Sequence, residues 1–130
     1  MDTSLIVIIL VGAAFALFYL NRIKNSKNMI PPQKFKELLE EDPGIIIDVR
    51  TKGEFKSGHL KEVDHNFDVT SGEFNEKVRN LDKNKVYYLY CRTGARSGQA
   101  VNIMKRNNFE NVYNVGGLQS LVNAGFKQTS

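Results

Sequence analysis

The residues with the clearest chemical potential lie in one segment, Tyr90 to Ala100, which reads Y-C-R-T-G-A-R-S-G-Q-A. The segment holds the only cysteine of the chain, Cys91, directly after an apolar run. A cysteine attacks as its thiolate, and a thiolate needs positive potential nearby. Arg92 and Arg96 supply two fixed charges, and Gly94 permits a tight backbone curl. The segment therefore predicts nucleophilic sulfur chemistry on a bound anion.

The elements on either side of Cys91 would position it. Residues 86–90, V-Y-Y-L-Y, are the strongest strand signal of the chain, and residues 97–107 have helical apolar spacing. Ligands of open α/β sheets bind beyond the carboxyl ends of strands, and a helix N-terminus carries positive potential. Backbone N–H groups from Arg92 to Ser97 would then form an anion cradle. An inert, buried cysteine before an ordinary basic loop is the alternative, and the arginines, the glycine and the helix start argue against it.

Strand and helix patterns alternate along the rest of the chain. Strands are predicted at 45–49, 66–69, 86–90 and 111–115, and helices at 32–41, 72–81, 97–107 and 118–124, with a short helix around Glu54. Residues 45–49 form a β-branched run without alternation, which is typical of a strand buried on both faces. The connections are too long for hairpins, so the pattern predicts an α/β fold with a mainly parallel sheet.

The first 28 residues have a different character. Residues 5–20 form an apolar run, and no charge lies between Asp2 and Arg22. As a helix this uncharged stretch would be roughly 28 Å long, close to the thickness of a hydrocarbon core. We predict an uncleaved, single-pass transmembrane helix and short linker at 1–28, then a soluble domain at 29–130. A cleaved signal peptide is the alternative, but the N-region M-D-T-S has no Lys or Arg.

Charge and cysteine content bear on the orientation of the chain in a membrane and on whether it binds nucleic acid or metal. Arg22, Lys24 and Lys27 follow the apolar run, so the positive-inside rule places the domain in the cytoplasm. The net charge is +4, and the basic residues alternate with acidic ones, which argues against a nucleic-acid stripe. One cysteine without a close histidine pair makes a metal site improbable. We expect His59 to be a hydrogen-bonded structural residue.

The sequence C-R-T-G-A-R-S resembles the active-site loop of the rhodanese family of sulfurtransferases. Further resemblances follow in the family's order, at Ile47-Asp48-Val49-Arg50, Glu54-Phe55, Gly58-His59-Leu60, Val115-Gly116-Gly117-Leu118 and Ala124-Gly125-Phe126. Together they cover roughly residues 29–130. The chain departs from the family at residues 61–65, where a proline-glycine-alanine type segment is usual, and at Leu121, where a Trp is frequent.

This resemblance implies a parallel sheet flanked by helices on both faces, here preceded by the predicted transmembrane helix. It implies that Cys91 takes sulfane sulfur from an anionic donor such as thiosulfate, forms a persulfide, and passes the sulfur to cyanide or a thiol. Arg92 and Arg96 would hold the donor, and the loop backbone would cradle the sulfur. The implied substrate-binding residues are Arg92, Thr93, Gly94, Ala95, Arg96 and Ser97. No cofactor and no metal are implied.

Two other functions stay open. One is a membrane-tethered sulfur-relay or binding module, in which a protein partner gives sulfur to Cys91 or receives it. The other is a phosphatase or arsenate reductase, which needs a wider cradle of the form C-x-x-x-x-x-R, whereas Arg96 falls one place earlier here. Asp48 and Arg50 would lie at the pocket rim or pair to shape loops, with Glu54 as a possible partner, and we favour the pairing.

Overall fold

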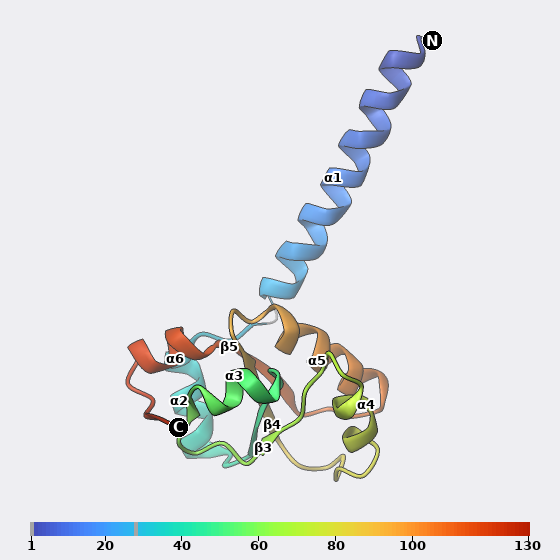
Figure 1. Cartoon of the computed structure of the whole chain (residues 1–130). Helices are drawn as coiled ribbons and strands as arrows, with labels where there is room; N and C mark the ends of the chain where they lie inside the picture. Colours follow the sequence, from blue (N-terminus) through green and yellow to red (C-terminus); the bar gives the residue numbers. More distant parts are fainter. Residues whose placement is uncertain (1, 28) are drawn as a thin grey trace.

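The computed structural model describes the backbone of residues 2–27 and 29–130, and the side chains of residues 2–17 and 29–130. Its elements are α1 Thr3–Lys27, α2 Pro32–Glu41, β1 Ile45–Asp48, α3 Lys52–Lys56, β2 His59–Leu60, β3 His65–Asn66, α4 Glu73–Val78, β4 Tyr87–Cys91, α5 Ala95–Arg106, β5 Val112–Gly117, α6 Leu118–Asn123 and β6 Gln128–Thr129. Figure 1 shows α1 extending away from a layered domain that holds the other elements.

The main sheet is parallel, as predicted. Its strand order is β3-β1-β4-β5, and every neighbouring pair runs in the same direction. The central strands β1 and β4 are each covered on both faces, which explains their β-branched and aromatic residues without polar alternation. This order places the carboxyl end of β4, where Cys91 lies, between the ends of β1 and β5.

Helices cover both faces of the sheet, which confirms the layered fold (Figure 1). Alternate strand residues point to opposite faces. Ile47 and Leu89 join a core with residues of α4 and α5, such as Phe74 and Met104. Ile46 and its neighbours face the other way, and their core includes Phe35 of α2, Leu121 of α6, Tyr88 and Tyr90. Leu121, which stands where the family often has a Trp, is fully buried and packs in this second core.

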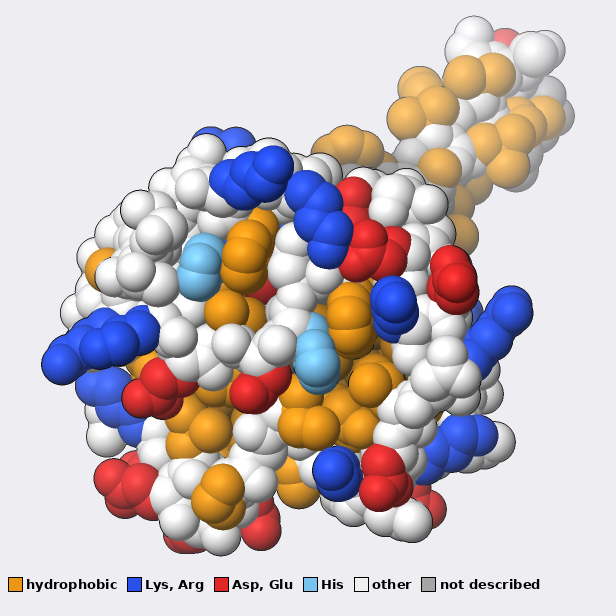
Figure 2. Space-filling view, turned by 60° about the horizontal axis from the view of Figure 1, so that its bottom comes forward, with side chains coloured by type: hydrophobic (Ala, Val, Ile, Leu, Met, Phe, Trp, Pro, Cys, Tyr) orange, Lys and Arg blue, Asp and Glu red, His pale blue; other side chains and the backbone are white. Residues whose placement is uncertain are grey.

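Four shorter elements differ from the sequence-based prediction. The strand expected at 66–69 is β3, His65–Asn66, and the helix expected at 72–81 is the shorter α4. A second, antiparallel pair joins β2 to the C-terminal β6. Strands of two residues give no periodicity, so this pair left no signal in the sequence. Figure 2 shows the lower face of the domain, where basic and acidic side chains are interspersed.

The N-terminal segment requires a correction. It is helical, and α1 continues to Lys27 through most of the expected linker. Among the described residues, however, no helix is long and apolar enough to cross a membrane. The transmembrane anchor predicted over residues 5–20 is therefore not supported. Its residues 18–20, and the side chains of Arg22, Lys24 and Lys27, lie outside the described side chains.

Candidate active site

The loop after β4 brings the sulfur of Cys91 to the start of a helix. Helix α5 begins at Ala95, two residues before the predicted start at Ser97. Its N-cap is Gly94, with φ of 100°, a left-handed conformation that glycine adopts at no steric cost. A Cβ at this position would lie 2.6 Å from the sulfur of the flexible Met29 side chain and 3.3 Å from the Gly116 Cα, so the backbone angle is the main reason for glycine here.

Hydrogen-bond donors converge on the sulfur. The backbone N–H of Gly94 donates to Cys91 Sγ over 3.0 Å, and the Ser97 hydroxyl lies 3.4 Å from it. The Cys91 side chain is fully buried, and burial by itself raises the pKa of a thiol. The hydrogen bonds from the Ser97 hydroxyl and from the backbone of Ser97, Thr93 and Gly94 outweigh burial, so the pKa of Cys91 lies below its usual value. These hydrogen bonds therefore favour the thiolate form of Cys91.

Asn114 of β5 ties this loop to the sheet, and the sequence analysis missed it. Its side chain is almost fully buried and donates from Nδ2 to the carbonyl of Gly94 over 2.9 Å. Its Oδ1 accepts from the N–H of Gly116 at 3.0 Å and lies 2.7 Å from Ser97 Oγ, so Asn114 and Cys91 Sγ share the single hydroxyl proton of Ser97. The one signal in the sequence was a polar residue inside the apolar run V-Y-N-V. Asn114 positions the loop and does not reach the sulfur.

The end of β5 approaches the loop closely. Its register against β4 shifts between Leu89 and Tyr90, so that Gly116 and Gly117 lie beside Tyr90 and Cys91. A Cβ at Gly117 would stand 2.4 Å from the carbonyl oxygen of Arg92. Because these two residues are glycines, the end of β5 can pack directly against the backbone of the loop that follows β4.

Arg96 is held by a carboxylate. Its Nη1 and Nη2 donate to the two oxygens of Glu54 over 2.7 and 2.9 Å. Thr51 and Glu54 form a capping box at the start of α3, which fixes the carboxylate in place. The hydrogen bond from Arg96 is the main reason that the pKa of Glu54 is lowered to about 2. Sequence analysis placed Arg96 on the donor, whereas its planar fork is occupied by Glu54.

Arg92 is the loop arginine that faces an open space. It is exposed and lines a cavity of about 640 Å³ together with Arg50, Glu54 and Gln119. Cys91 itself does not line this cavity.

These features match those of a known family. The Rhodanese-like domain family matches residues 31–124. The chain belongs to the rhodanese family.

Relatives in Bacillus subtilis (strain 168) carry names that concern sulfur. The chain is 32% identical over 84 residues to "Putative sulfur carrier protein YrkF", a match of 64% of this chain and 44% of that protein. It is 33% identical over 86 residues to "Putative sulfurtransferase YtwF", covering 65% of this chain and 81% of that protein. A rhodanese-related protein from Thermoplasma volcanium has a similar structure, with a TM-score of 0.66, 26% identity and coverage of 78% and 97% of the two chains. The chain thus spans less than half of YrkF.

The rhodanese domain brings the other predicted site residues together around the loop. Thr93 and Ala95 are exposed at the loop surface, and Ser97 is buried beneath it. Asp48 and Arg50 pair with each other, Nη2 to Oδ2 at 2.7 Å, as favoured from the sequence. Arg50 also donates to the carbonyl of Gly58, so this pair shapes the neighbouring segment. Glu54, the partner considered for them, binds Arg96.

Proposed function

We propose that this rhodanese domain is a sulfurtransferase that carries sulfane sulfur on Cys91. The observation that carries the proposal is the convergence of the Gly94 N–H and the Ser97 hydroxyl on Cys91 Sγ. Donors fixed by the fold stabilise an anion without reorganisation, because they already point at it. The family and the sulfurtransferase-named relatives support the same chemistry.

The proposed reaction has two displacement steps. The Cys91 thiolate attacks the outer sulfur of thiosulfate, a bond between the two sulfurs forms, and sulfite leaves with the electron pair of the old S–S bond. Cyanide or a thiolate then attacks the terminal sulfur of the persulfide, and Cys91 leaves as the thiolate. The loop N–H groups would hold negative charge at the sulfur in both steps.

Arg92 is the residue that we assign to the anionic donor. It is exposed at the 640 Å³ cavity beside the loop, whereas the guanidinium groups of Arg50 and Arg96 bind carboxylates. Arg92→Ala should therefore raise KM for thiosulfate about tenfold with little loss of stability, since exposed charges contribute little to folding. Arg96→Ala should lower stability and kcat together. Equal effects on KM from both variants would contradict the assignment.

Intact mass spectrometry tests the function itself. Incubation of the full chain with thiosulfate should add one sulfur atom, about 32 Da, because thiosulfate transfers only its outer sulfur. The Cys91→Ser variant is the control and should gain nothing. Absence of the adduct in the unaltered chain under reducing, donor-rich conditions would refute the proposal.

A sulfur relay with a protein partner is the second candidate. It is favoured by the name of YrkF and by the size of the cavity, which exceeds what thiosulfate needs. Under this function the mass adduct would form slowly with thiosulfate and quickly with a partner persulfide. The ratio of the two rates decides between the candidates.

The cellular location predicted from the sequence stays a prediction. It placed the domain on the cytoplasmic side of a membrane, and the fold and the relatives bear on the domain alone. Alkaline extraction of membranes containing the full chain tests it, because peripheral proteins are released and spanning ones are retained. Complete release would contradict an anchored location.

A further inference from the structure

A second hollow lies on the face of the sheet opposite the Cys91 side chain. Cys91 belongs to the core under α4 and α5, whereas Ile46 and Leu60 belong to the core under α2 and α6. The hollow has a volume of about 350 Å³ and is lined chiefly by Lys36, Ile46, Leu60, Lys61, Phe126 and Lys127. It shares no lining residue with the cavity beside the catalytic loop.

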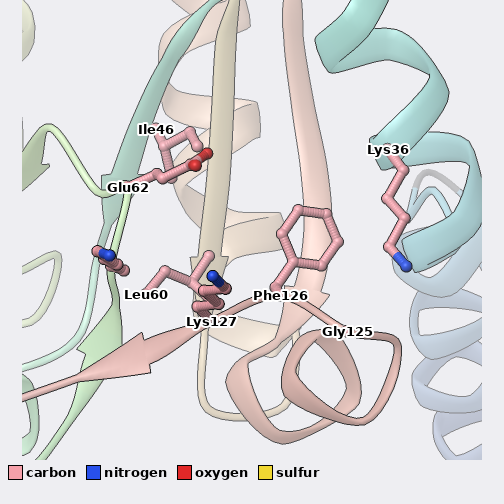
Figure 3. Close-up of a pocket in the computed structure, with 8 residues that line it drawn as sticks. Lys36, Ile46, Leu60, Glu62, Gly125, Phe126 and Lys127 are labelled. Carbon is pink, nitrogen blue, oxygen red and sulfur yellow. The ribbon is translucent and has the colours of Figure 1, made fainter.

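The floor of the hollow is apolar. Ile46 and Leu60 are buried, and Phe126 is half-buried and stacks on Phe35 with ring centroids 4.8 Å apart. Figure 3 shows Phe126 between Lys36 on one side and Leu60 with Lys127 on the other. The space therefore offers contact to a hydrocarbon chain or ring.

The rim is positively charged. Lys36, Lys61 and Lys127 all line it, against one carboxylate, Glu62, which lies beside Ile46 in Figure 3. Of the ion pairs found between described residues, none involves these three lysines. The rim thus carries uncompensated positive charge over an apolar floor.

Several chain segments hold the hollow in shape. The N–H of Lys61 donates to the carbonyl of Lys127 over 2.9 Å, and the Lys36 ammonium group donates to the carbonyl of Ala124. Gly125 makes the turn between them with φ of 106°. A Cβ there would lie 3.1 Å from Lys36 Nζ. The walls come from α2, β1, the segment after β2 and the C-terminal segment, so the hollow is a product of the fold.

We propose that this hollow binds a small, soluble amphiphilic anion: a carboxylate or sulfonate with a medium alkyl chain or one ring. Its volume is at the lower end of small-molecule pockets, which span about 300–1,000 Å³, and excludes bulky ligands. The anionic group would lie among the lysines, and the apolar part would lie on Phe126, Ile46 and Leu60. The inference is independent of sulfur transfer.

Titration of the ¹⁵N-labelled full chain followed by NMR tests this site. The probe is octanoate, with octan-1-ol as the uncharged control and acetate as the control without a chain. Octanoate should cause saturable shifts of the Leu60, Lys61, Phe126 and Lys127 amides. Each control compound should bind at least about fivefold more weakly, because it lacks either the charge or the apolar area.

Variants sharpen the test. The double variant Lys61→Gln, Lys127→Gln removes two exposed charges and leaves the apolar floor of the hollow unchanged. It should weaken octanoate binding at least about fivefold. Lys83→Gln with Lys105→Gln removes two exposed charges elsewhere and should change nothing. The proposal is overturned if octanoate shows no saturable shifts up to about 10 mM, if its shifts lie on α1, if octan-1-ol binds as tightly, or if the first double variant binds like the second. Each outcome leaves the Cys91 mass test unaffected.

Discussion

Two regions of this rhodanese domain have positive potential, and they have it from different sources. At the catalytic loop the positive potential comes from groups fixed by the backbone, the Gly94 N–H and the first turn of α5. At the opposite hollow it comes from ammonium groups on flexible side chains over an apolar floor. Fixed dipoles suit one sulfur atom that must be held while its charge changes. Flexible lysines suit the varied head groups of larger molecules.

The comparison predicts that backbone changes at the loop have the largest effects. Gly94→Ala places a side chain at φ of 100° and against the Met29 sulfur. We expect a loss of about 2–3 kcal/mol in the free energy of unfolding, and of most sulfur transfer, measured by denaturant titration and thiocyanate formation.

Two glycine controls separate the causes. Gly72 has φ of 86°, but a Cβ there would meet no atom. The smaller loss of unfolding free energy expected for Gly72→Ala therefore measures the cost of the left-handed backbone alone. Gly53→Ala has open space and no left-handed φ, so it should cost nothing. If Gly94→Ala proved as mild as Gly53→Ala, the loop would not be fixed as described.

The next effect should come from Asn114. Asn114→Ala leaves the buried Gly116 N–H without its side-chain partner and removes one of the two donors to the Gly94 carbonyl, which keeps the N–H of Gly98. We expect a loss of about 2 kcal/mol in unfolding free energy, because buried polar groups left unpaired are costly. Asn123→Ala, at an exposed position, is the control and should lose almost nothing. A similar loss of unfolding free energy in both variants would show that Asn114 does not stabilise the loop.

Removal of one donor to the sulfur should have a smaller, chemical effect. Ser97→Ala deletes the hydroxyl that lies 3.4 Å from Cys91 Sγ. A hydrogen bond to a charged group is worth about 1.5 kcal/mol, so the pH midpoint of Cys91 ionisation should move up by at most about one pH unit. Rates of alkylation of Cys91 across pH measure it. An unchanged pH profile would show that the backbone alone holds the anion.

The smallest effect concerns the pair between Arg96 and Glu54, outside the sulfur's immediate surroundings. The pKa of Glu54 is about 2, below the usual 4.5, so ionised Glu54 contributes stability that is present above pH 4.5 and lost as pH falls toward 2. The two side chains are 25% and 30% exposed, and solvent screening reduces the contribution to about 1 kcal/mol. Glu54→Gln should therefore match the unaltered chain near pH 2 and lose about 1 kcal/mol at pH 7. The free energies of unfolding of both proteins are measured against pH. A constant difference between them down to pH 2 would contradict this pairing.

Much of the fold and of the loop followed from local sequence patterns. The apolar runs at 45–49 and 86–90 and the helical spacing after Ser97 predicted a mainly parallel sheet with Cys91 at the end of a strand. Such features depend on neighbours along the chain, which the sequence states directly. A helix over residues 5–20 also followed, but α1 continues to Lys27 through most of the expected linker, and its assignment as a membrane span is not supported among the described residues.

The features that were missed depend on contacts between distant residues. Glu54 and Arg96 are 42 positions apart, and Asn114 bonds to Gly94 across 20. Nothing local in the sequence showed the Glu54–Arg96 pair, and the donor-binding role expected of Arg96 stays a prediction. Asn114 was overlooked because a polar residue in a strand ordinarily faces solvent. The Glu54–Arg96 pair and the hydrogen bonds of Asn114 form only in the folded chain, between residues far apart in the sequence.

The most direct test of the central claim is a titration of Cys91 in the folded full chain, followed by the thiolate's ultraviolet absorbance and confirmed by its absence in Cys91→Ser. The account predicts a midpoint below that of an ordinary thiol, about 8.5, because loop donors outweigh burial. A midpoint at or above the ordinary value would show that burial prevails and that the loop does not hold a sulfur anion.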